Sequence, residues 1–167
     1  MFAGGPLLGT EISVSSPIEP KRPRMNGVTR EEIRVDGLNE PISHYTDAVR
    51  FGNLLFVSGV APLDSEGRVS SDDVVVQSQQ VFENLARILD AAGATFGDVL
   101  KVTVFLTDVR DRSKINSVRQ KYFGTARPAS TLIGVKELAI PGMKIEIEAV
   151  VGLPKNARLI RAEGSAR

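Results

Sequence analysis

Few side chains in this sequence of 167 residues belong to the types that usually carry chemistry. There is no cysteine, which excludes a thiol nucleophile, thiolate metal ligands and disulfides. The single histidine, His44, cannot build a multi-histidine metal site, and no carboxylates have the spacing of an alternative site. We therefore expect no metal.

The charged residues are balanced, with 21 basic and 20 acidic side chains and a net charge of +1. Such a chain has no general field that would draw it onto nucleic acid. The one basic cluster, Lys21, Arg22 and Arg24, is more typical of a solvated tail than of a nucleic-acid arm. No run reaches the roughly 18 apolar residues of a membrane span, and the N-terminus lacks the pattern of a signal peptide. We expect a cytoplasmic protein without nucleic-acid or membrane partners.

The length and the 42% hydrophobic content fit one globular domain. Residues 1–29 are rich in Gly, Pro and Ser and lack a sustained period, which predicts a flexible extension. Met25 near its end is an alternative start of the natural chain. Residues 155–167 are again polar and predict a tail. The domain is therefore expected over residues 30–154.

Five segments have the composition of strands, and they are 48–51, 54–58, 99–106, 131–135 and 144–151. Gly52-Asn53 between the first two is the turn chemistry of a hairpin. In the last segment apolar residues alternate with charged ones that include Glu146 and Glu148, so one face is expected to be buried.

Two helices are predicted between these strands. The first begins after Asp72 or Asp73, carries apolar residues at helical spacing and ends at Gly93. The second begins after Asp111 or Ser113 and ends at Gly124. The order ββαβαββ predicts an α/β (α+β) fold, a single sheet with both helices on one face. Apolar residues on both sides of the segment 99–106, with Leu100 on the side of Val102, indicate that other subunits cover the second face.

Several short motifs carry a resemblance to a known family. They are Gly52-Asn53-Leu54-Leu55-Phe56-Val57-Ser58-Gly59, Gln80 with Asn84-Leu85, Ala91-Ala92-Gly93-Ala94, Lys101-Val102-Thr103-Val104-Phe105-Leu106, Asn116 with Tyr122-Phe123, Arg127-Pro128-Ala129-Ser130-Thr131, and Ile145-Glu146-Ile147-Glu148-Ala149. From Tyr45 to Val151 the chain resembles the RidA/YjgF (Rid) family of enamine/imine deaminases. This resemblance implies a chorismate-mutase-like fold, a homotrimer with ligand pockets between subunits, and cofactor-independent hydrolysis of reactive enamines and imines.

The resemblance implies a role for five residues, each of which also has a plainer explanation. Tyr45 matches a tyrosine that lines the pocket, or is an ordinary core aromatic. Ser58 and Gly59 match a strand end whose hydroxyl and backbone N–H face the ligand, or are simply the end of a strand. Asn116 matches a pocket asparagine, or is a solvated helix residue. Glu146 matches the acidic residue that positions or activates water, or is a charge on an exposed strand face.

The sequence departs from the family pattern at Ser130, between Ala129 and Thr131. The resemblance implies an arginine there, whose guanidinium holds the substrate carboxylate through two charge-assisted hydrogen bonds. A serine hydroxyl is short and neutral, so it cannot replace that pair. Arg127 stands three residues earlier and is an alternative anchor, although Pro128 restricts the backbone between them and the separation is about 10 Å in an extended segment.

Two functions follow from these residues. The first is a Rid-like hydrolase acting on an enamine, imine or related C–N compound such as a 2-aminomuconate-type intermediate. In it Glu146, Ser58 and Asn116 are the catalytic candidates, and Tyr45, Gly59, Ser130, Thr131 and Arg127 the substrate-binding ones. The second is a non-catalytic trimer that binds a small molecule. The charge distribution does not support an endoribonuclease, a third activity that older family naming suggests.

Overall fold

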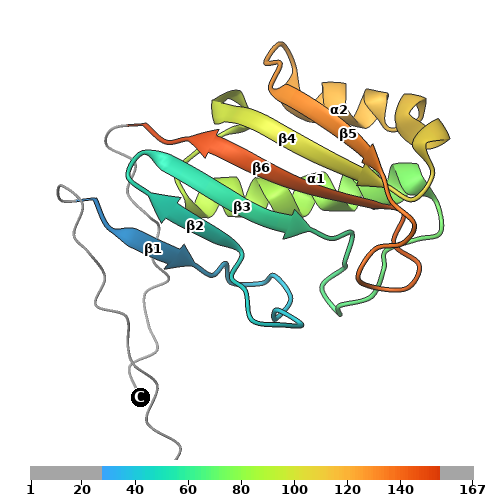
Figure 1. The fold of residues 1–167 in the computed structure, drawn as a ribbon, viewed down its shortest axis with the longest axis horizontal. Helices are drawn as coiled ribbons and strands as arrows, with labels where there is room; N and C mark the ends of the chain where they lie inside the picture. The colour runs from blue at the N-terminus through green and yellow to red at the C-terminus, as the bar shows by residue number, and fades with distance from the viewer. Residues whose placement is uncertain (1–27, 155–167) are drawn as a thin grey trace, which may run out of the picture.

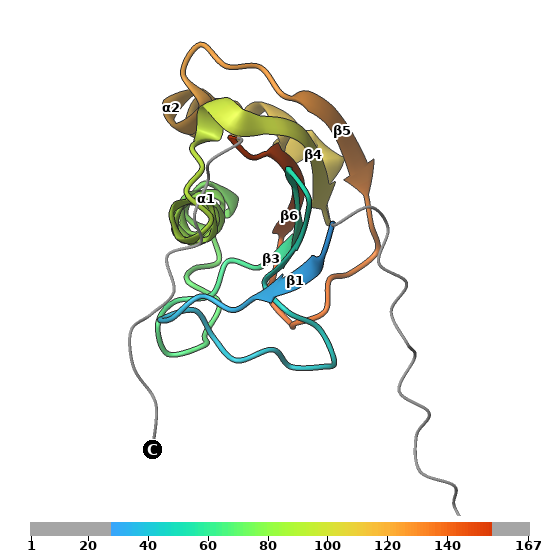
Figure 2. The ribbon, with the colours of Figure 1, turned by 90° about the vertical axis from the view of Figure 1, so that its left-hand side faces the viewer.

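The computed structural model describes residues 28–154, so the predicted N-terminal extension (but for its last two residues) and the C-terminal tail lie outside the described residues. The described part forms one six-stranded sheet with two α-helices on one face, and the other face carries no helix (Figures 1 and 2). Its elements are β1 (Arg30–Ile33), β2 (Ala48–Phe51), β3 (Leu54–Val60), α1 (Val74–Ala91), β4 (Val99–Leu106), α2 (Asn116–Phe123), β5 (Ala129–Gly134) and β6 (Ile145–Gly152), with 3₁₀ turns η1 (Phe96–Asp98) and η2 (Val109–Ser113).

The sheet confirms the predicted α+β architecture. Its strand order is β1-β2-β3-β6-β4-β5, so the last strand in sequence lies at the centre and β5 forms an edge. β4 and β5 are parallel, as expected for two strands joined through a helix, whereas β6 is antiparallel to both β3 and β4. Ile145, Ile147, Ala149 and Val151 are all buried, which confirms the predicted alternation of β6.

β1 is a strand that the sequence did not predict. Three of its four residues are charged, so it shows neither the alternation nor the β-branched content that marks a strand. It forms through antiparallel pairing with β2, with Ile33 opposite Ala48. The observed order is therefore βββαβαββ, and the additional strand extends the sheet beside the predicted hairpin.

The first helix has the predicted ends. The Asp73 carboxylate accepts hydrogen bonds from the N–H groups of Val75 and Val76, and Gly93 adopts a φ of 67° just beyond the last turn. Its apolar face, with Val81, Leu85 and other buried residues, packs on the sheet. The sequence allowed either Asp72 or Asp73 as the N-cap, and the structure shows that it is Asp73.

The second helix begins later than predicted. The segment after β4 forms the 3₁₀ turn η2, which Asp108 caps by accepting from the Arg110 N–H, and α2 starts only at Asn116. Neither Asp111 nor Ser113 caps it, and its N-cap residue, Ile115, makes no side-chain cap bond. Gly124 ends the helix as expected, with a φ of 56°.

A register shift in β4 overturns the predicted side of Leu100. Between Val99 and Lys101 the pairing with β6 is irregular, so Leu100 leaves the helix-facing side and is 53% exposed. It joins Phe51, Phe56 and Ile133 as large apolar side chains that are exposed on the described chain. Phe56 and Ile133 lie on the sheet face that carries no helix, because their strand neighbours Leu55 and Leu132 pack into the core.

Candidate functional site

The main candidate site is a cavity of about 450 Å³ beside the end of β3. Four parts of the chain form its walls: the connection between β1 and β2, the end of β3 with the residues that follow it, the middle of α1, and the segment that leads into β6. The residues that the site depends on are Glu40, Tyr45, Asp47, Ser58, Gly59 and Glu146. The cavity thus brings together four of the residues that the sequence singled out: Tyr45, Ser58, Gly59 and Glu146.

Glu146 lies directly against Gly59. A Cβ atom added to Gly59 would overlap the Glu146 carboxylate, so only glycine leaves room for this side chain. The space exists because the pairing of β3 with β6 shifts between Val57 and Val60. Burial, and secondarily the negative charge of Glu148, raises the pKa of Glu146 above its ordinary value. A carboxylate with a raised pKa accepts a proton more readily, which suits a general base.

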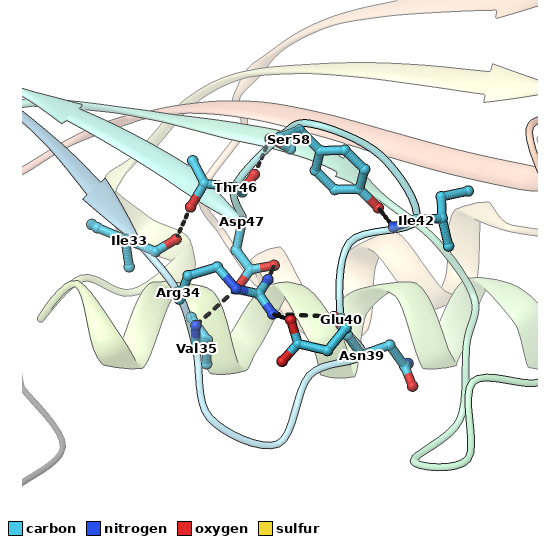
Figure 3. Close-up of polar contacts among 10 residues, drawn as sticks. Ile33, Arg34, Val35, Asn39, Glu40, Ile42, Thr46, Asp47 and Ser58 are labelled. Atoms are coloured by element: carbon cyan, nitrogen blue, oxygen red, sulfur yellow. Dashed lines mark hydrogen bonds and ion pairs between the residues drawn. The ribbon is translucent and has the colours of Figure 1, made fainter. Parts of the chain in front are cut away.

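The hydrogen bonds of Ser58 fix it to the two residues that precede β2. Its hydroxyl donates to the Thr46 carbonyl oxygen at 2.6 Å, and its N–H donates to the Asp47 carbonyl oxygen at 3.0 Å (Figure 3). The Ser58 N–H is therefore used within the protein, while the hydroxyl oxygen retains lone pairs that can accept from a ligand.

Tyr45 lies in the cavity wall and is 49% exposed, so it is not a core aromatic. Its hydroxyl oxygen accepts a 3.4 Å hydrogen bond from the Ile42 N–H, which orients the ring along the β1–β2 connection (Figure 3). An aromatic ring with this exposure offers an apolar wall and a hydroxyl to a small molecule.

A partly buried ion pair holds the β1–β2 connection in place, and sequence reasoning missed it. Asp47 accepts hydrogen bonds from the Arg34 guanidinium at 2.6 Å and from the Val35 N–H at 2.8 Å, while Arg34 also contacts Glu40 (Figure 3). Burial raises the pKa of Asp47, although the Val35 and Arg34 contacts oppose this. No sequence spacing signals this pair, because its partners are 13 residues apart in an irregular segment.

Two amides of α1 hold the remaining walls. Asn84 donates to the carbonyl oxygens of Ala61 and Leu63, which follow β3. Gln77 donates to the Gly142 carbonyl oxygen and accepts from the Lys144 N–H, immediately before β6. Both side chains are buried and fix the backbone that positions Gly59 and Glu146, and Asn84 also lines the cavity.

The cavity is acidic. Glu40, Asp47 and Glu146 all contribute to its lining, and no lysine, arginine or histidine does so among the described residues. Its remaining lining is largely apolar, with Leu38, Ile140 and similar side chains. Such a cavity favours a compact ligand whose reacting part is neutral or becomes positively charged.

The other four candidates lie elsewhere, on α2, on β5 and between them. Asn116 begins α2, Arg127 stands between α2 and β5, and Ser130 and Thr131 belong to β5. None of the four lines the cavity within the described chain. Thr131 is exposed and pairs with Thr103 in β4, whereas Ser130 pairs with the buried Val102 and so faces the helix side.

An arginine that sequence reasoning missed stands beside Ser130. Arg119 on α2 donates from Nη2 to the Ser130 hydroxyl at 2.9 Å. Asn116 lies three residues earlier on the same helix, so the two side chains share a face. A single chain therefore holds two separate groups of candidate residues, one in the cavity and one at the β5 edge.

Within residues 28–154 no group of three or more His, Asp or Glu side chains is arranged to hold a metal ion. None of the helices in this range is long and apolar enough to cross a membrane.

Comparisons with known proteins agree with this architecture. The family model described as endoribonuclease L-PSP matches residues 37–152. A RutC family protein of Pyrococcus horikoshii is 40% identical over 122 residues, which cover 72% of this chain and 96% of the relative. The 2-iminobutanoate/2-iminopropanoate deaminase of Mus musculus is 34% identical over 128 residues, covering 75% and 93%. The crystal structure of the YjgF gene product of E. coli superimposes with a TM-score of 0.68 at 32% identity, covering 73% and 98%.

The match spans every element from β2 to β6 and includes the cavity, and the sequence motifs and the sheet order point to the same relatives. The chain therefore belongs to the endoribonuclease L-PSP family, the group that contains the RidA/YjgF proteins.

Proposed function

We propose that the protein is a deaminase that hydrolyses small imines or enamines to carbonyl compounds and ammonia. The observation that carries this proposal is the Glu146 carboxylate, partly buried with a raised pKa and held against Gly59 in a cavity of small-molecule size. The name of the mouse relative as a 2-imino acid deaminase supports the same reaction class. The net charge of +1 gives no comparable support to a ribonuclease.

The proposed reaction begins with a water molecule that Glu146 activates. The water oxygen bonds to the C=N carbon while Glu146 accepts one of its protons, and the nitrogen, protonated in the imine, becomes an amine. Glu146 then returns the proton to this nitrogen, the C–N bond breaks, and the hydroxyl on carbon becomes a carbonyl as Glu146 accepts its proton. Glu146 passes this second proton to the departing ammonia, so one water is consumed and one ammonium ion leaves. The acidic cavity stabilises the positive charge of the protonated imine.

We further propose that the working site forms between copies of this chain in a homotrimer. The helix-free sheet face exposes Phe56 and Ile133, and unpartnered apolar side chains of this size favour association. The two groups of candidate residues lie apart in one chain, with Glu146 facing the helix-free side and Ser130 the helix side of the edge strand. A neighbouring copy that places its β5 edge at the cavity brings Asn116, Ser130 and Thr131 to Glu146.

A non-catalytic binding trimer is the alternative. It keeps the cavity and the assembly but lacks hydrolysis, so the assay below separates the two functions. The substrate range is tested with 2-iminopropanoate, generated in place by an amino acid oxidase, and with 2-aminomuconate as the larger catabolic candidate.

Replacing the proposed base tests the reaction directly. Glu146→Gln should lower kcat at least about a hundredfold, because an amide cannot accept the proton of water. Glu148→Gln, on the same face of β6, should retain activity and shift the acidic limb of the pH profile downward, since its charge raises the pKa of Glu146. Glu146 must be ionised to act, so wild-type kcat should fall as pH decreases through a value above the ordinary glutamate pKa. Unchanged kcat in Glu146→Gln would remove this residue from the mechanism.

The contact between Gly59 and Glu146 gives a second prediction. Gly59→Ala should displace the carboxylate and lower kcat by about a hundredfold, a typical cost of misplacing a catalytic group by about 1 Å. Gly97→Ala is the matched control, because a Cβ there meets only the Thr95 hydroxyl at 3.4 Å. Circular dichroism of both variants checks the fold. Full activity in a folded Gly59→Ala protein would show that the position of Glu146 is unimportant.

The assembly gives a third prediction. Light scattering at micromolar concentration should report three times the mass of the chain, and Phe56→Glu should reduce this to a monomer by placing a charge on the helix-free face. Val76→Glu is the control, because Val76 has a similar exposure, 42% against 46%, but lies on α1. A monomeric wild-type protein would contradict the proposed site between copies.

A further inference from the structure

Arg119 is a partly buried cation held in a defined position. Its backbone N–H donates to the Ile115 carbonyl oxygen within the first turn of α2, and its guanidinium Nη2 donates to the Ser130 hydroxyl across the gap to β5. A guanidinium has five N–H donors, and Ser130 uses one of them. The helix and the edge strand thus hold the group while most of its donors stay available.

Arg119 differs from the other well-placed arginines because no carboxylate pairs with it in the described chain. Arg34, Arg68 and Arg110 each contact an acidic side chain within 3.2 Å. The neighbouring Asp108 raises the pKa of Arg110, whereas burial lowers the pKa of Arg119 and no negative group offsets it. A desolvated guanidinium without a counter-charge gains more from binding an anion than a solvated one does.

Within the described chain, Arg119 lacks a negative partner, and the cavity lacks a positive one. Two of the cavity's three carboxylates, Glu40 and Asp47, already pair with Arg34, and no basic residue lines it among residues 28–154, so it offers no cation to a substrate carboxylate. The printed name of the mouse relative specifies 2-iminobutanoate and 2-iminopropanoate, and each of these molecules carries a carboxylate next to the imine carbon. A site for such molecules needs one cation from outside the cavity.

We propose that Arg119 binds the substrate carboxylate, with the Ser130 hydroxyl holding the guanidinium in place. This inference rests on the proposed deaminase function and on the site between copies, since Arg119 of one chain meets the cavity of another. It assigns Ser130 a positioning role instead of direct carboxylate binding. Arg127 is the weaker candidate, because it is exposed and no hydrogen bond or ion pair holds its side chain within the described chain.

Paired arginine variants test this assignment. Arg119→Gln should lower kcat/KM for 2-iminopropanoate at least about tenfold, mainly through KM, because it removes a charged hydrogen-bonding partner of the substrate. Arg112→Gln, at an exposed arginine of η2, is the control and should have no effect. The loss should be confined to the carboxylate, so the methyl ester of the same imine should react equally well with wild type and Arg119→Gln. Ser130→Ala should raise KM less than Arg119→Gln does, and light scattering should show that all three variants keep the wild-type assembly.

Pyruvate is a keto acid that carries the same carboxylate. Its binding tests the role of Arg119 independently of the hydrolysis reaction. Isothermal titration should detect pyruvate on wild type and Arg112→Gln but not on Arg119→Gln. If the wild-type protein binds pyruvate through Arg119 but releases no ammonia, the deaminase function fails and the anchor stands. Deaminase activity that persists in Arg119→Gln with unchanged KM would overturn the anchor and leave the function. Equal losses with the acid and its ester would also overturn it, because they would indicate a structural role.

Discussion

The central position of β6 is the constraint on which the site depends. Hydrogen bonds to β3 on one side and β4 on the other fix its register, and four alternate side chains bury themselves under the helices. Glu146 must then point to the opposite face, because successive residues of a strand alternate. The register shift in β3 places Gly59 beneath it and leaves room for the carboxylate. Gln77 anchors the residues just before this strand, so the helix layer also controls where Glu146 stands.

Desolvation is the physical basis for our proposal that the two groups of residues act together. Glu146 is a carboxylate whose burial raises its pKa, in a cavity whose described lining holds no basic residue. Arg119 is a cation whose burial lowers its pKa at the edge strand of the sheet. In the assembly that we propose, a ligand with a positive imine and a negative carboxylate compensates both groups. The proposed association also covers Phe56 and Ile133, which are exposed in the single chain.

Sequence periodicity predicted the elements whose signal is local. The alternation of β6, the Gly52 turn, the Asp73 cap and the apolar stripe of α1 are all present, because each depends on residues near one another in the chain. β1 was missed because its charged residues pair only through the neighbouring strand. The late start of α2 depends on a 3₁₀ turn, and the exposure of Leu100 depends on a register shift. Neither feature produces a periodic pattern in the sequence.

Part of the candidate site was also predictable, from the family resemblance and not from periodicity. Tyr45, Ser58, Gly59 and Glu146 were identified from the family resemblance, and the structure brings them to one cavity. The partly buried Arg34–Asp47 pair and the Arg119–Ser130 contact join residues 13 and 11 positions apart without a regular spacing, so only the folded chain reveals them. The separation of the two groups likewise follows from strand order, which the sequence does not specify.

Complementation between impaired subunits tests most directly whether the site forms between copies. Glu146→Gln and Arg119→Gln proteins are mixed in equal amounts, unfolded, refolded together and assayed for 2-iminopropanoate hydrolysis at a substrate concentration well below the wild-type KM, where both variants are slow. If each site takes Glu146 from one chain and Arg119 from its neighbour, random assembly leaves about a quarter of the sites intact, and activity should return to about a quarter of that of refolded wild type. If both residues act within the same chain, every site carries one of the two substitutions. Activity in the mixture that did not exceed the average of the separate variants would contradict the account.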